Sequence, residues 1–130
     1  MSQREQVEDW LHFLLINVLV NALEEEGFAV EADHVGGMRQ KPESIGGYVP
    51  DIVARKGDQI RLIEVETQST LASSRTASQI EAFCQHASAT IIVAVPFDCL
   101  TPARRLREEL DLDFVIMPCY PLVKYVGVPR

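Results

Sequence analysis

Residues 46–70 decide the fold of this chain, and they read Gly46-Gly-Tyr-Val-Pro-Asp-Ile-Val-Ala-Arg-Lys-Gly-Asp-Gln-Ile-Arg-Leu-Ile-Glu-Val-Glu-Thr-Gln-Ser-Thr70. Two short apolar runs, Tyr48–Ala54 and Ile60–Val65, flank the sequence Lys56-Gly57-Asp58-Gln59. Glycine and aspartate adopt the positive φ that a tight turn between antiparallel strands requires. The stretch therefore predicts a β-hairpin.

Three carboxylates are expected to meet at one end of this hairpin. Glu64 and Glu66 are two residues apart near the end of the second strand, so their side chains share one face. Asp51 lies near the start of the first strand, which in a hairpin is beside the end of the second. Carboxylates packed so closely repel one another unless a cation lies between them or some of them hold protons.

The arrangement of Pro50-Asp51, the hairpin and Glu64-Val65-Glu66 resembles the motif of the PD-(D/E)xK nuclease superfamily, in its restriction-endonuclease-like and Holliday-junction-resolvase-like branches. The resemblance extends from Gly27 to Val95. Glu66 stands where the family has a lysine, as it does in some restriction enzymes. The resemblance implies an α/β protein with the restriction-endonuclease-like αβββαβ core, a central mixed sheet flanked by helices.

The same resemblance implies a nuclease that hydrolyses phosphodiester bonds of DNA or RNA with Mg²⁺ or Mn²⁺ as its cofactor. Asp51 and Glu64 would hold the metal together with the backbone carbonyl of Val65. Glu66 would act as a base or orient the attacking water. A small number of hard oxygen ligands, with the other positions left to water and substrate, is what these cations prefer.

Four further residues are second-rank candidates for the site. Gln79 and Arg75 belong to the helix expected after the hairpin, where several branches of the superfamily place a polar or basic residue near the metal. Lys56 or Arg75 would compensate for the charge of the missing lysine. The first helix contributes a glutamate in many relatives, and counting three turns back from Gly27 reaches Asn17 instead. Asn17 would ligate the metal weakly or hydrogen-bond a metal-bound water; a polar residue satisfied at a helix interface is the alternative.

The rest of the chain predicts helices that alternate with strands. The expected elements are an amphipathic helix over 3–26, a strand over Phe28–Asp33, a loop from His34 to Ile45, a helix from Ser73 or Ser74 to about His86, a strand buried on both faces over Thr90–Val95, a helix that Thr101-Pro102 opens and that ends near Leu110, a strand over Phe114–Met117, and an edge strand over Leu122–Val126. This order agrees with the αβββαβ core without using the motif.

Composition and charge narrow the class of protein. The 130 residues are expected to form one domain, 1–130, with an ordinary soluble composition of 47% hydrophobic and 24% charged residues. The net charge of −7 argues against a protein that simply coats nucleic acid. Residues 1–34 hold one cation and eight acids, whereas residues 35–130 hold eleven of each. The carboxylates of the hairpin therefore have basic neighbours, which permits a metal site that faces a phosphate.

Membrane and disulfide classes are not expected. The longest uncharged apolar run, Leu11–Leu23, is too short to span a bilayer and does not resemble a signal peptide, so the cytoplasm is the expected location. The three cysteines contain no Cys-x-x-Cys pair and are expected to be buried thiols.

Three interpretations stay open. The first is a metal-dependent endonuclease that binds nucleic acid and acts as a homodimer or within a larger complex. The second is a catalytically inactive relative that binds nucleic acid or protein. The third is hydrolysis of another phosphoester. Glu-Val-Glu is also typical of a half-exposed strand and Pro-Asp of a turn. Affinity for a divalent cation at Asp51, Glu64 and Glu66 would distinguish the first interpretation from the second.

Overall fold

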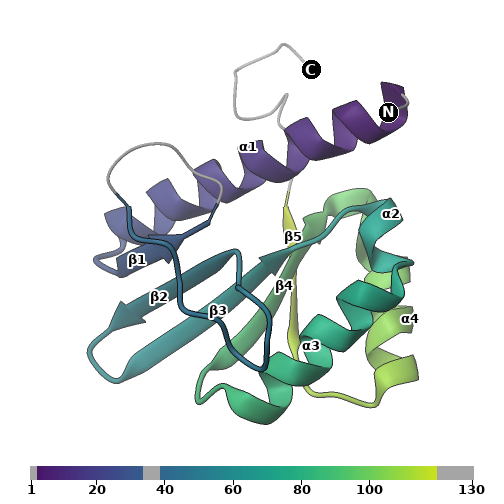
Figure 1. The fold of residues 1–130 in the computed structure, drawn as a ribbon. Helices are drawn as coiled ribbons and strands as arrows, with labels where there is room; N and C mark the ends of the chain where they lie inside the picture. The colour runs from purple at the N-terminus through teal and green to yellow at the C-terminus, as the bar shows by residue number, and fades with distance from the viewer. Residues whose placement is uncertain (1–2, 34–38, 120–130) are drawn as a thin grey trace.

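A computed structural model of the chain describes residues 3–33 and 39–119. Within these ranges five strands form one sheet in the order β1-β2-β3-β4-β5, and helices cover both of its faces (Figure 1). Along the chain the elements are α1 (Gln3–Glu25), β1 (Ala29–Ala32), β2 (Ile52–Lys56), β3 (Gln59–Val65), α2 (Gln68–Leu71), α3 (Ser74–His86), β4 (Thr90–Pro96), the 3₁₀ turn η1 (Phe97–Cys99), α4 (Leu100–Leu110) and β5 (Val115–Cys119).

The sheet is mixed, as the sequence predicts. β1, β2 and β3 are antiparallel to one another, and β4 and β5 are added parallel to β3. The expected hairpin is β2–β3, closed by a two-residue loop in which Gly57 has a φ of +58°. The α/β class and the mixed sheet flanked by helices are therefore confirmed.

The first strand of the hairpin begins later than expected. It starts at Ile52 instead of Tyr48, and Asp51 occupies a bend just before it. Tyr48 instead forms an isolated bridge with Ile45 across a turn made by two glycines with positive φ. Pro50 has no backbone N–H and so cannot donate to the ladder of an interior strand.

This glycine turn packs closely against α3. At Gly46, whose φ is +60°, a Cβ would lie 2.9 Å from the Cβ of Ala82 and 2.9 Å from Cδ2 of His86. Only glycine fits such an approach with that backbone conformation. The segment that leads into β2 is thereby held against the helix that follows β3.

Two buried clusters lie on opposite faces of the sheet. The cluster under α1 includes Leu15 and Ile16 together with Ile63 and Val65 from the sheet. The cluster under α3 and α4 includes Phe83 with Leu62 and Val93, among others. Residues Ile91–Val95 of β4 are buried throughout, as predicted for a strand covered on both faces. Consecutive strand residues thus alternate between two cores.

Three smaller expectations need correction. A short helix, α2, interrupts the polar stretch after β3. The 3₁₀ turn runs directly into α4, so α4 begins at Leu100 with Cys99 as its N-cap instead of Thr101. β5 continues through Pro118, which is tolerated because β5 is at the edge of the described sheet. The expected N-cap Ser73 is confirmed for α3, and the strand predicted over Leu122–Val126 lies outside the described residues.

All three cysteines lie within the described residues. Cys99 and Cys119 are buried, Cys84 is half-buried, and all three are free thiols. None of the helices in the described ranges is long and apolar enough to cross a membrane.

We expect Phe83→Ala to lower the free energy of unfolding by about 3–5 kcal/mol, because it removes a fully buried ring from the core under α3 and leaves a cavity. Phe97→Ala is the matched control; its ring is 53% exposed, and the loss should stay below about 1 kcal/mol. Urea unfolding followed by circular dichroism measures both. Equal losses for the two variants would contradict the assigned packing of α3.

Candidate functional site

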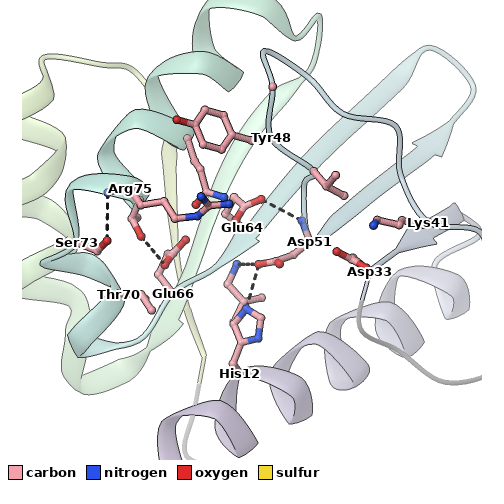
Figure 2. Close-up of a pocket in the computed structure, with 15 residues that line it drawn as sticks. His12, Asp33, Lys41, Tyr48, Asp51, Glu64, Glu66, Thr70, Ser73 and Arg75 are labelled. Carbon is pink, nitrogen blue, oxygen red and sulfur yellow. Dashed lines mark hydrogen bonds and ion pairs between the residues drawn. The ribbon is translucent and has the colours of Figure 1, made fainter. Parts of the chain in front are cut away.

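The three carboxylates of the hairpin meet in one pocket. Asp51 lies in the bend before β2, Glu64 lies within β3, and Glu66 follows its last residue. The register that pairs Ile52 with Ile63 brings Asp51 beside Glu64. All three line a cavity of about 490 Å³ at the end of the sheet, between α1 and α3 (Figure 2). The carboxyl groups are nearly inaccessible to solvent, with 8%, 3% and 4% of the residues exposed.

Two hydrogen bonds connect the strands at this point. The backbone N–H of Asp51 donates to Oε1 of Glu64 at 3.0 Å, and the backbone N–H of Val65 donates to Oδ2 of Asp51 at 2.8 Å. Both bonds are buried. Val65 lines the pocket through its backbone, because its side chain belongs to the core under α1.

Glu66 receives a hydrogen bond from α3. The hydroxyl of Thr76 donates to Oε2 of Glu66 at 3.3 Å, and both residues are buried. The backbone N–H of Glu66 donates to the carbonyl of Ala94, which continues the β3–β4 ladder past the end of β3. The position of this carboxylate is therefore fixed by the sheet and its orientation by the helix.

His12 also belongs to the pocket, although it is not among the residues predicted from the sequence. Its Nε2 lies 3.3 Å from Oδ2 of Asp51, and Figure 2 shows the ring rising from α1 toward the carboxylates. A signal was present: His12 precedes the buried residues Leu15 and Ile16 by three and four positions, so it lies on the core-facing stripe of α1. A histidine on such a stripe faces the sheet.

The pocket shifts the proton affinities of these groups. Burial raises the pKa of Glu64 well above its usual range, and the charges of Asp51 and Glu66 add to this effect. Burial also raises the pKa of Glu66 to about 7, although hydrogen bonding to Thr70 and, less strongly, to Thr76 opposes the shift. Burial disfavours the charged form of His12, but its hydrogen bond to Asp51 and the surrounding carboxylates outweigh burial and raise the pKa of the imidazole. The folded pocket therefore retains protons.

Two cations lie at the rim of the pocket. Lys41 lines it from the loop before β2, and Arg75 lines it from the first turn of α3. The guanidinium carbon of Arg75 lies 5.5 Å from the centre of the Tyr48 ring, within cation–π range. Gln79, one turn further along α3, also lines the pocket. The structure thus brings together Arg75 and Gln79, as expected, with Lys41.

Two second-rank candidates lie elsewhere. Lys56 is at the turn end of the hairpin, roughly 17 Å along β2 from Asp51, and its Nζ donates to the backbone carbonyl of Glu26 at 2.6 Å. Asn17 donates from Nδ2 to the carbonyl of Phe13 at 2.9 Å, one turn back on α1. The prediction that α1 contributes to the site is right, but Asn17 is on the wrong side of the helix. The side of α1 that faces the sheet carries His12 instead.

The donor set suits a hard divalent cation in its chemistry. The hydrogen bonds above use Oδ2 of Asp51, Oε1 of Glu64 and Oε2 of Glu66, one oxygen from each carboxylate. Carboxylate and carbonyl oxygens are the ligands that Mg²⁺ and Mn²⁺ prefer. In residues 3–33 and 39–119, however, no three His, Cys, Asp or Glu side chains are already arranged to hold a metal ion. Two of the carboxylates are instead hydrogen-bonded to backbone N–H groups.

Comparison of the chain with known proteins adds no assignment. No family model matches it, and neither the curated proteins nor the solved structures give a significant match. The function of the site is therefore argued from its residues.

We expect the free energy of unfolding to fall as the pH rises from about 5 to about 8. The folded protein keeps a proton on Glu66 up to a pKa of about 7, whereas the unfolded chain releases it near 4.5, so deprotonation favours unfolding. Glu66 alone would account for up to about 3 kcal/mol. The raised pKa values of Glu64 and His12 act in the same direction.

Urea unfolding of the wild type and of Glu66→Gln across this pH range measures the effect. The amide can still accept from Thr76 but does not titrate, so the variant should lose much of the decline. Glu81→Gln, on the exposed side of α3, is the control and should behave as the wild type does. A wild-type stability that rises with pH would show that the pocket does not retain protons.

Proposed function

We propose that this chain is a metal-dependent nuclease that hydrolyses phosphodiester bonds of DNA or RNA with Mg²⁺ or Mn²⁺. The observation that carries the proposal is the convergence of three buried carboxylates in a pocket with Lys41 and Arg75 at its rim. Burying carboxylates without a compensating charge costs free energy, so a buried cluster of them indicates a functional site. The contact that His12 makes with Asp51 compensates only part of this charge.

The order of elements supports a restriction-endonuclease-like core. α1, β1, β2, β3, α3 and β4 follow one another as the αβββαβ order requires, with the short α2 added between β3 and α3. The carboxylates come from the start of β2 and the end of β3, as the motif implies. Shared fold order does not establish activity by itself, so the proposal depends on the site.

In this proposal Asp51, Glu64 and the backbone carbonyl of Val65 would hold the cation. When bound, it would supply charge neutralisation at the phosphate and a lowered pKa for an attacking water. Arg75 and Lys41 would orient the phosphate from opposite sides of the pocket, which Figure 2 illustrates. Arg75 would thereby supply positive charge that the family lysine provides in relatives.

Glu66 would accept the proton from the attacking water. A base is most effective when its pKa is near the working pH, and that of Glu66 is about 7. Thr76 would hold the carboxylate in place through its hydrogen bond. A glutamate at this position would therefore perform proton transfer, where a lysine would mainly supply charge.

A second candidate function is a non-catalytic module that binds nucleic acid or protein. The observation that favours it is the use of Asp51 and Glu64 as hydrogen-bond acceptors for the backbone at the start of β2 and the end of β3. In this alternative the carboxylates stabilise the end of the sheet, and no cation is required.

Titration calorimetry with Mg²⁺ and Mn²⁺, paired with cleavage assays on plasmid, branched DNA and RNA, tests the proposal. We expect Asp51→Asn to lose the heat of metal binding and to lower cleavage by at least about 100-fold, because even residues that only orient metal ligands cost 10–100-fold. The amide oxygen can still accept from the N–H of Val65, so the fold should be kept. Asp58→Asn, in the exposed hairpin turn, is the matched control and should bind and cleave normally.

Metal binding should also release protons, because the cation competes with a proton for Glu64, whose pKa is raised in the pocket. The heat measured near pH 6.5 should therefore depend on the ionisation enthalpy of the buffer. A folded wild-type protein that gives no metal heat and no cleavage would contradict the nuclease and leave the binding module.

A further inference from the structure

Most of the lysines and arginines whose side chains the structure describes contact acceptors of the chain itself. The structure describes the side chains of nine lysines and arginines. Three of them pair with glutamates: Arg39 with α1, Arg55 with β1 and Arg61 with the turn that follows α1. Two more, Lys56 and Arg107, donate to backbone carbonyls. The other four of the nine are Lys41, Arg75, Arg104 and Arg105, and of these only Lys41 and Arg75 line the carboxylate pocket. Among the nine described cations, therefore, only these two are placed to contact a polyanion at the pocket.

The acidic end of the chain also borders the pocket. α1, from which His12 projects, carries Glu8 and Asp9, which line a neighbouring pocket that shares His12 and Thr70 with the carboxylate pocket. Asp33 lines the pocket on the same side. A long nucleic acid that continued past the pocket over α1 would meet negative charge, and that repulsion is opposite to electrostatic steering.

The dimensions of the pocket agree with this charge distribution. Its volume of about 490 Å³ lies in the range of sites for small molecules and cofactors. Proteins that track a strand instead use a basic groove that covers roughly 4–16 nucleotides. A pocket of this size with one cation on each side suits two neighbouring phosphates.

We infer that the substrate of this site is a short single-stranded segment or strand end, held through about two phosphates, and that the chain does not track duplex DNA. This inference rests on the proposed nuclease function and names its substrate class. Lys41 and Arg75 are the residues that contact the phosphates. Tyr48, against which Arg75 lies, supplies the aromatic part of the pocket wall beside the segment.

Fluorescence anisotropy in Ca²⁺, used to allow binding without cleavage, tests the inference with labelled oligothymidylates of about 3 and about 20 nucleotides and with a duplex of about 20 base pairs. We expect the short and long single strands to bind with the same affinity per binding register, so that the longer strand gains only a statistical factor of about 20 or less, and the duplex to bind more weakly. The slope of log K against log salt should be near −1.4, since each phosphate contact on a single strand contributes about −0.7.

Charge variants locate the two contacts. Lys41→Gln and Arg75→Gln should each reduce the salt slope by about 0.7. Arg105→Gln removes an exposed arginine that lies on α4, outside the carboxylate pocket, and should leave the slope unchanged. Tight duplex binding with a slope steeper than about −4 would overturn the inference while leaving the nuclease intact. Failure of the nuclease proposal is seen separately, as the absence of metal heat in the wild type.

Discussion

Two crossed hydrogen bonds at the end of the hairpin set the geometry on which the pocket depends. The backbone of Asp51 binds the side chain of Glu64, and the side chain of Asp51 binds the backbone of Val65. Each bond joins the residue before β2 to the final residues of β3. The carboxylates are therefore part of the sheet's own bonding, and their positions are determined by strand register instead of by side-chain packing. A side chain held in this way loses little conformational freedom when a ligand arrives.

The same arrangement places a strong constraint on charge. Three buried carboxyl groups lie together at one pocket, where burial and mutual repulsion favour protonation of Glu64 and Glu66 and the pairing of Asp51 with His12. Protons, the imidazole and a divalent cation would all relieve the same repulsion, so they compete for it. The pocket is accordingly a place where ligand binding, protonation and fold stability are coupled.

The sequence predicted those parts of the site that follow from local rules. Glu64 and Glu66 share a face because strand residues alternate, and Asp51 joins them because antiparallel pairing fixes which ends meet. Arg75 and Gln79 were found because a helix after β3 must pack back over the sheet. These predictions use only elements that lie close together in the sequence.

The site and strand predictions that were wrong depend on longer-range geometry or on competing local structure. Whether His12 or Asn17 faces the carboxylates is decided by the rotation of α1 against a sheet formed later in the chain. Lys56 does not reach the carboxylates because β2 places it at the turn end of the hairpin, whereas Asp51 precedes the other end of that strand. The first strand of the hairpin was started too early because the turn at Gly46 pairs Tyr48 with Ile45.

The two outer strands of the described sheet disfavour edge-to-edge pairing with the sheets of other chains. β1 has only four residues, and Pro118 removes a backbone donor from β5. Neither edge offers an uninterrupted row of hydrogen-bonding groups, which is how natural sheets avoid fusing with one another into larger sheets or fibrils. Edge-to-edge pairing of the described sheet with a second sheet is therefore disfavoured.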